Sequence, residues 1–192
     1  MQTSFRSMVA AAAVLAVAGV AQAHVEVFTA FLSGANEAPV NTSPASGFTT
    51  VTLDLDLATL RVQVDFTGLL GNVSACHIHG LTALPGVGTA GVMTPTPTFP
   101  GFPSGVRAGS YDATLDLTLA SSYNAAFITA SGGTVSGAFN RLVQSLEEGR
   151  AYLNVHSQAF PGGEIRGFLV PTPGAAAVLG MAGLVAMRRR RA

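Results

Sequence analysis

The sequence predicts an all-β fold, an antiparallel Greek-key β-sandwich or barrel with one short helix, and three observations support this class. Apolar side chains recur at every second position over residues 51–57, 60–66 and 113–119, as in strands with one buried and one wet face. The composition is rich in turn formers, with 22 glycines and 10 prolines among 192 residues. Between the two ends of the chain, apolar residues follow helical spacing over 136–148.

Each expected element follows from its local pattern. A first strand is expected at 28–32, with a turn after it at 36–39. Only Ala58 and Thr59 separate the alternating stretches 51–57 and 60–66, which predicts a hairpin. The helix over 136–148 is expected to end at Gly149, because glycine is favoured just beyond a helix.

Residues 81–109 fit neither period and hold five of the ten prolines, including those at positions 95, 97, 100 and 103. A loop of this length inside a compact domain is uncommon and is often a functional lid. Its proline content equally suits an inert surface excursion, and the sequence leaves both interpretations open.

The first 23 residues have the pattern of a secretory signal peptide. Arg6 supplies the positive charge, residues 8–21 are apolar, and Ala21-Gln22-Ala23 is a small-x-small cleavage site. Cleavage there leaves His24 at the mature N-terminus and exports the domain across the inner membrane. An N-terminal membrane anchor is the alternative.

Residues 171–192 combine a short break around Pro171 and Pro173, an apolar run over 174–187, and a basic cluster at Arg188, Arg189, Arg190 and Arg191. Fourteen helical residues span about 21 Å, which makes a short membrane anchor halted by positive charge. This order of a proline-containing break, an apolar run and an arginine cluster resembles the PEP-CTERM sorting signal of Gram-negative bacteria. The resemblance implies an exosortase-like sorting enzyme as partner. Thr172 stands where that family has glutamate. A plain C-terminal membrane anchor is the alternative.

The charge of residues 24–170 argues against nucleic acid as a partner. Five arginines stand against ten carboxylates there, and the chain has no lysine, whereas nucleic-acid binding needs a basic stripe. The single cysteine, Cys76, excludes an intramolecular disulfide.

Side chains alternate between the two faces of a strand, and in three predicted strands the ionisable residues fall on the face opposite the aliphatic ones. His77 and His79 lie two apart, so on a strand both imidazoles share a face, opposite to Cys76 and Ile78. The same parity in 151–157 and 164–169 sets further polar residues opposite the aliphatic ones. These residues are Tyr152, Asn154, His156, Glu164 and Arg166.

Two chemistries suit such a cluster. His77, His79 and His156 supply three nitrogens of the kind that bind Zn²⁺ or Cu²⁺. Alternatively, an Arg166–carboxylate pair and imidazoles bonded to the backbone or to Asn154 form a polar network without metal, structural or facing a partner. Cys76 has core parity, so a buried hydrophobic role is expected for it.

Several motifs resemble the CHRD domain, named after chordin and common in secreted bacterial proteins. They are Gly34-x-Asn36-Glu37-x-Pro39, His77-Ile78-His79-Gly80, Gly149-x-x-Tyr152-Leu153-Asn154-Val155-His156 and Gly163-Glu164-Ile165-Arg166-Gly167. The resemblance covers most of residues 26–169. It implies an extracellular β-rich domain and no known enzyme activity, with partner binding by analogy.

A second, weaker similarity is to Cu/Zn superoxide dismutase, through Gly68-Leu69, His77-x-His79 and Val155-His156. No histidine or aspartate lies between Gly80 and Tyr111, where that family has its bridging histidine and zinc ligands. Dismutase activity is therefore not expected, while a superoxide-dismutase-like or Ig-like sandwich is.

Two functions follow from these observations. The first is a secreted, cell-surface-associated, non-enzymatic domain without a cofactor, which binds an extracellular protein or polysaccharide and is transiently membrane-anchored through its C-terminal helix. It rests on the two chain ends, on the resemblance to the CHRD domain, and on the lack of a nucleophile–base or paired-acid motif. The second is a periplasmic or surface protein that binds copper or zinc through His77, His79 and His156.

Overall fold

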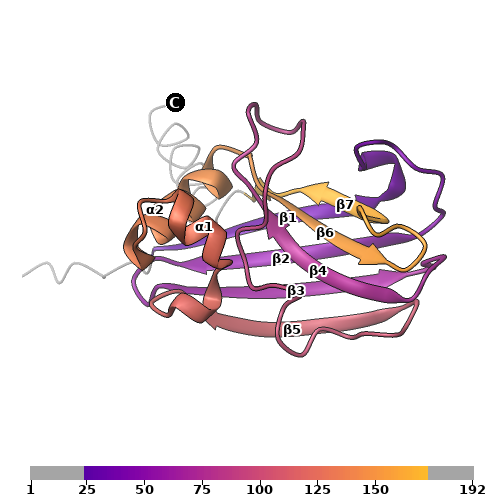
Figure 1. The fold of residues 1–192 in the computed structure, drawn as a ribbon, viewed down its shortest axis with the longest axis horizontal. Helices are drawn as coiled ribbons and strands as arrows, with labels where there is room; N and C mark the ends of the chain where they lie inside the picture. The colour runs from indigo at the N-terminus through magenta and orange to yellow at the C-terminus, as the bar shows by residue number, and fades with distance from the viewer. Residues whose placement is uncertain (1–23, 173–192) are drawn as a thin grey trace, which may run out of the picture.

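The computed structural model describes residues 24–172, which form one antiparallel sheet curled into a half-barrel (Figure 1). Its order is β4-β6-β7-β1-β2-β3-β5, and β8 also pairs with β1. The strands are β1 Val25–Ser33, β2 Ser46–Asp54, β3 Thr59–Thr67, β4 Val73–His79, β5 Gly109–Asp116, β6 Tyr152–Ser157, β7 Ile165–Phe168 and β8 Val170–Pro171. The predicted all-β antiparallel class is confirmed.

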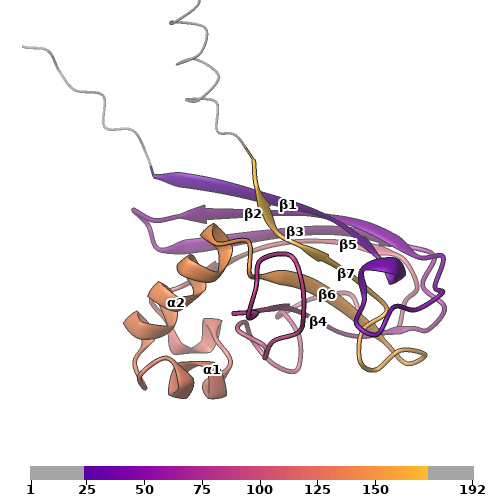
Figure 2. The same ribbon diagram turned by 90° about the horizontal axis from the view of Figure 1, so that it is seen from above.

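The half-barrel has two layers, seen edge-on in Figure 2. One layer contains β1, β2, β3 and β5, and the other contains β4, β6 and β7. Aliphatic and aromatic side chains from both layers, among them Phe28, Ile78 and Leu153, are fully buried between them. The helices lie at one end, where Leu142 and Leu146 join the same core.

The predicted hairpin is confirmed as β2 and β3, with Val51 opposite Val62 and Leu53 opposite Leu60. However, β2 ends at Asp54, earlier than expected, because the Asp54 carboxylate accepts hydrogen bonds from the amides of Asp56 and Leu57 at 3.0 and 2.9 Å. Leu57 therefore lies in a turn and is 70% exposed.

The strand expected at 113–119 also lies earlier, as β5, Gly109–Asp116. Asp116 ends it in a similar way, because its carboxylate accepts from the Thr118 amide at 2.9 Å. Both ends show a short polar side chain that competes with the sheet for backbone amides.

The predicted helix is confirmed as α2, Val135–Glu147, which begins where the Thr134 hydroxyl accepts from the Gly137 amide at 3.0 Å. Gly149 follows it with a φ of 63°, the left-handed conformation expected beyond a helix end. A second helix, α1, Ala125–Ala130, was not expected, since six residues are too few for a periodic signal. Two 3₁₀ turns, Gly34–Asn36 and Ala120–Ser122, complete the elements.

The long loop after β4 packs along the free edge of that strand. The amides of Met93 and Phe99 donate to the carbonyls of Ile78 and Cys76 at 2.9 and 3.1 Å. Met93 and Phe99 are also fully buried. The loop therefore supplies both hydrogen bonds and core side chains, and it is an integral part of the domain.

The predicted signal peptide, residues 1–23, lies outside the described residues, as do Pro173 and Arg188 to Arg191. The fold continues as far as Thr172, whose amide donates to the Val27 carbonyl at 2.8 Å. Pro171, assigned from the sequence to the sorting signal, belongs to β8 beside Phe28. Within residues 24–172, no helix has the length and apolar character needed to cross a membrane.

Candidate metal centre

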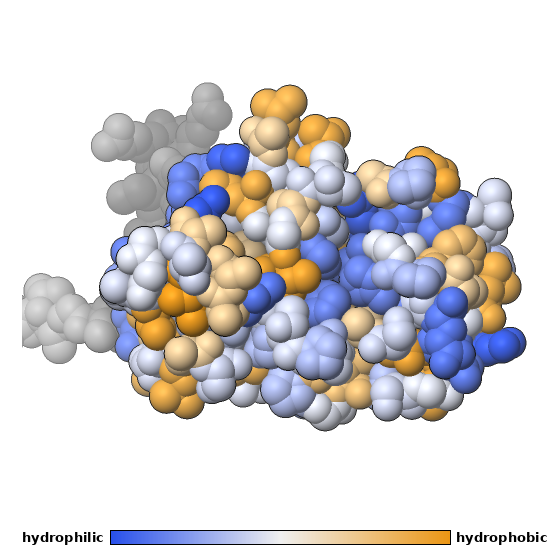
Figure 3. Space-filling view, viewed as in Figure 1, coloured by the Kyte–Doolittle hydropathy of each residue, from blue (hydrophilic) through white to orange (hydrophobic). Residues whose placement is uncertain are grey.

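Two neighbouring strands bring the histidines together. In the β4–β6 register, Ala75 lies opposite His156 and His77 opposite Asn154. Cys76 and Ile78 point into the half-barrel, so His77, His79 and His156 lie on its outer face. Figure 3 shows hydrophilic residues gathered in a hollow over β4 and β6 on this face.

The three imidazoles form a compact group. The ring centroids of His77 and His156 are 4.9 Å apart, those of His77 and His79 are 5.4 Å apart, and those of His79 and His156 are 5.8 Å apart. One ring nitrogen from each lies within 4.8 Å of those from the other two. Although on the outer face, the side chains are buried, with 7–9% of each residue exposed.

Each histidine uses one ring nitrogen to bond a backbone carbonyl of a loop. His77 Nε2 lies 2.7 Å from the Pro97 oxygen, and His79 Nδ1 lies 3.0 Å from the Ala90 oxygen. His156 Nδ1 lies 2.9 Å from the Pro161 oxygen. Because a carbonyl oxygen only accepts, these three nitrogens carry the protons.

The other nitrogen of each neutral ring therefore presents a lone pair. These atoms are His77 Nδ1, His79 Nε2 and His156 Nε2, and each is buried without a hydrogen-bond partner among the described residues. A carbonyl that sets the tautomer and orientation of a histidine is the usual outer shell of a metal-bound imidazole.

The surroundings keep the rings neutral. Burial lowers the pKa of His77 and His79 to about 4, against the hydrogen bonds from their rings to Pro97 and Ala90, which raise it. Burial likewise lowers the pKa of His156. Neutral imidazoles at neutral pH are the form that binds metal.

The donor set fits a borderline metal ion. Three imidazoles around one zinc ion each place nitrogen at about 2.0–2.1 Å from the metal, so the three nitrogens must draw closer together than in this structure. Imidazole suits copper as well as zinc. Among residues 24–172, these three are the one group of three potential ligands that lie this close to one another.

Tyr152 and Arg166 line the group on one side. The Tyr152 ring stacks on His79, and the guanidinium carbon of Arg166 lies 4.7 Å from the Tyr152 ring centroid. The Tyr152 hydroxyl donates to the Ala90 carbonyl at 3.3 Å, the same carbonyl that accepts from His79. Tyr152 therefore supports both His79 and the loop segment that orients it.

The buried carboxylate beside Arg166 is Glu37, which the sequence marked only as part of a turn motif. Glu37 Oε2 lies 3.7 Å from Arg166 Nε. Burial raises the pKa of Glu37 to about 7, although Arg166, the Ala38 amide and Asn154 act to lower it. Glu37 Oε1 and Asn154 Oδ1 are further buried atoms without a hydrogen-bond partner within the described part of the chain.

Glu164, grouped by parity with Arg166, anchors other segments. Its carboxylate accepts from the Leu70 and Gly71 amides at 2.6 and 3.3 Å and from the hydroxyls of Ser43 and Ser157. Burial raises the pKa of Glu164, but these hydrogen bonds outweigh burial and hold it below its ordinary value. The Glu164 carboxylate therefore holds the segments around Ser43 and Leu70 against the end of β6 and is not available as a metal ligand.

Cys76 is fully buried in the core, as its parity indicates, and burial raises the pKa of its thiol well above the ordinary value. A thiol held protonated in the core is a poor metal ligand.

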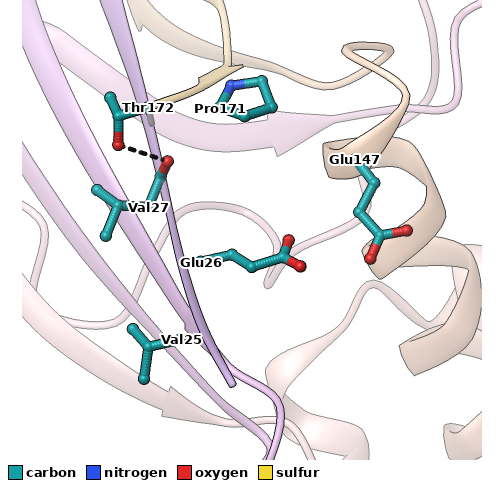
Figure 4. A pocket seen from close by; sticks show the side chains of 6 residues that line it. All are labelled: Val25, Glu26, Val27, Glu147, Pro171 and Thr172. Carbon is teal, nitrogen blue, oxygen red and sulfur yellow. Dashed lines mark hydrogen bonds between the residues drawn. The ribbon is translucent and has the colours of Figure 1, made fainter. Parts of the chain in front are cut away.

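A separate hollow lies where the start of β1, the end of α2 and β8 meet (Figure 4). Glu26 and Glu147 extend into it from β1 and α2. Burial and the Glu147 charge raise the pKa of Glu26, and His24 lowers it. Two carboxylates without a third ligand do not make a metal site comparable to the histidine group.

Comparison with protein families matches residues 28–169 to the CHRD domain. No curated protein and no solved structure matches the chain. The matched segment contains the three histidines and all of the strands except β8, with β1 entered at Phe28. On this evidence, the chain belongs to the CHRD domain family.

Proposed function

We propose that this chain is an exported, cell-surface-associated CHRD domain that holds one copper or zinc ion at His77, His79 and His156. One observation carries the proposal. Three buried imidazole nitrogens with lone pairs converge without a hydrogen-bond partner among the described residues, while the opposite nitrogen of each ring is held by a carbonyl.

The cost of burying unpaired polar atoms supports a metal ion at this site. A buried polar atom without a partner costs about 1–3 kcal/mol, and here three such atoms lie side by side. A structural network would use both nitrogens of each ring, whereas these rings use one. A single cation satisfies all three lone pairs at once.

We propose a binding role without catalysis. The ligand nitrogens are buried beneath the loop after β4, and all three donors are neutral imidazoles with no carboxylate in the ligand group. The signal-peptide pattern, the C-terminal apolar run and the arginine cluster support export and processing by an exosortase-like enzyme.

The test is elemental analysis of the full-length chain, exported through the periplasm and purified without refolding. We expect about one equivalent of copper or zinc per chain, and none in a His77→Ala/His79→Ala variant. His24→Ala is the matched control, because His24 is exposed and outside the group, and it should keep the metal.

A folded parent protein that neither contains metal nor takes up Cu²⁺ or Zn²⁺ in a titration would refute the metal site. Metal lost from His24→Ala instead would assign it to the mature N-terminus.

A further inference from the structure

Two surface grooves meet at one exposed aromatic side chain, Phe31. The first groove crosses the ends of β1, β2, β3 and β5 and is lined by Phe31, Ser46, Phe48, Asp65, Thr67 and Ser110, among others. The second runs from Phe31 past Asn36 and Val87 to Arg166 and Phe168. Both grooves are lined by Phe31, so they adjoin at this side chain, and the two together are called the track below.

The centre of the track is an aromatic pair. Phe31 and Phe48 lie opposite each other on β1 and β2, with ring centroids 5.0 Å apart. Phe31 is 78% exposed and Phe48 is 37% exposed. Cross-strand pairing explains their contact, but it does not explain why a phenylalanine this exposed stands at the junction of two grooves.

The charges of the track disfavour an anionic ligand. Arg166 is the one cation lining either groove, and its guanidinium already donates to the Asn36 and Gly88 carbonyls and pairs with Glu37. The one carboxylate lining either groove is Asp65. The remaining polar groups are hydroxyls, an amide and backbone atoms.

The strands beneath the track also disfavour an extended peptide. β1, β2 and β3 each have partners on both sides, so they offer no free edge to which a peptide strand could be added. β5 is an edge strand of the sheet, but it lines the track only with Gly109 and Ser110 at its start. Exposed aromatic rings flanked by neutral hydrogen-bonding groups suit a ligand with apolar faces and many hydroxyls.

We propose that this track binds a neutral polysaccharide. The C–H faces of the sugar rings pack against Phe31 and Phe48, and hydroxyl groups bond to the side chains of Ser46, Asp65 and Asn36. The track shares Arg166 with the surroundings of the histidine group, but none of the three histidines lines it, so the proposal does not depend on the metal.

The test is affinity electrophoresis of the full-length chain in native gels that contain hydroxyethylcellulose, laminarin or galactomannan, with anionic alginate as the comparison. We expect retardation by at least one neutral polymer and none by alginate. Phe31→Ala should weaken that retardation at least tenfold in apparent affinity, and Phe48→Ala should also weaken it.

Leu57→Ala is the matched control, because Leu57 is 70% exposed in the β2–β3 turn and lines neither groove. It should bind like the parent, and so should His77→Ala/His79→Ala if circular dichroism shows it folded. Retardation by none of the neutral polymers, preference for alginate, or equal binding by Phe31→Ala would each overturn the proposal.

Discussion

The His79 and Tyr152 rings lie face to face, with centroids 4.8 Å apart and an interplanar angle of 7°. The two residues are opposite each other in the β4–β6 register. Arg166 lies against the same tyrosine ring. The orientation of one candidate metal ligand is thus set by a cross-strand neighbour that supplies no ligand atom.

Removing the aromatic ring at position 152 should therefore weaken metal binding. We expect Tyr152→Leu to bind copper or zinc about 10- to 100-fold more weakly, the usual cost of losing an outer-shell partner. Tyr152→Phe keeps the stacked ring and loses only the hydroxyl bonded to Ala90, so its loss should be smaller. Competition with a chromophoric chelator measures both, and equal affinity of the leucine variant and the parent would refute this role for Tyr152.

The metal-free protein should lose stability as the pH falls from about 6.5 to about 4. His77 and His79 have pKa values of about 4 when folded, against about 6.5 in an unfolded chain. Between these values the unfolded chain takes up protons that the folded chain does not, so acid favours unfolding. Their stabilising contribution is complete above about pH 6.5 and is lost below it.

Urea unfolding of chelator-treated protein at several pH values measures this effect. A His77→Gln/His79→Gln variant should show a shallower fall in the free energy of unfolding across the same window. Parallel curves for the parent and the variant would show that these histidines titrate alike in both states.

Glu37 has the opposite effect on the pH dependence of stability to that of His77 and His79. Its pKa of about 7 when folded means that the folded state retains a proton which the unfolded chain releases between about pH 4.5 and 7. Glu37→Gln removes this opposing contribution. We therefore expect the unfolding free energy of the variant to fall more steeply on acidification, with a slope that corresponds to about one additional proton taken up on unfolding. The same urea series compares the slopes, and an unchanged slope would contradict the raised pKa.

Glu164 should matter for folding and not for metal selectivity. Glu164→Gln replaces one of the two carboxylate oxygens by an NH₂ group, which then faces either the Leu70 amide, a donor to Oε1, or the Gly71 amide, a donor to Oε2. Buried donors left unpaired in this way should destabilise the domain by about 3 kcal/mol. Urea unfolding at pH 7 measures the change, with Glu147→Gln as an exposed control expected to resemble the parent. A Glu164→Gln domain as stable as the parent would show that these hydrogen bonds are dispensable.

Strand positions were more predictable than strand ends. Alternation located β2, β3 and β5 because each strand residue turns its side chain to the face opposite its neighbour's. Alternation also predicted that two strands continue beyond Asp54 and Asp116, where they in fact end. Each strand ends because the aspartate carboxylate accepts hydrogen bonds from backbone amides of the following turn, and the spacing of apolar residues contains no sign of this. Leu57 and Leu119 consequently lie in exposed turns.

The sequence by itself determined the faces. Period-two geometry is a property of the extended backbone, so it placed His77, His79 and His156 opposite the aliphatic core before any strand pairing was known. The tertiary structure alone decided what meets them there. The carbonyls of Ala90, Pro97 and Pro161 come from loops, and Arg166 meets Glu37 rather than Glu164. Those contacts depend on how distant segments pack together, which the local pattern of a chain does not encode.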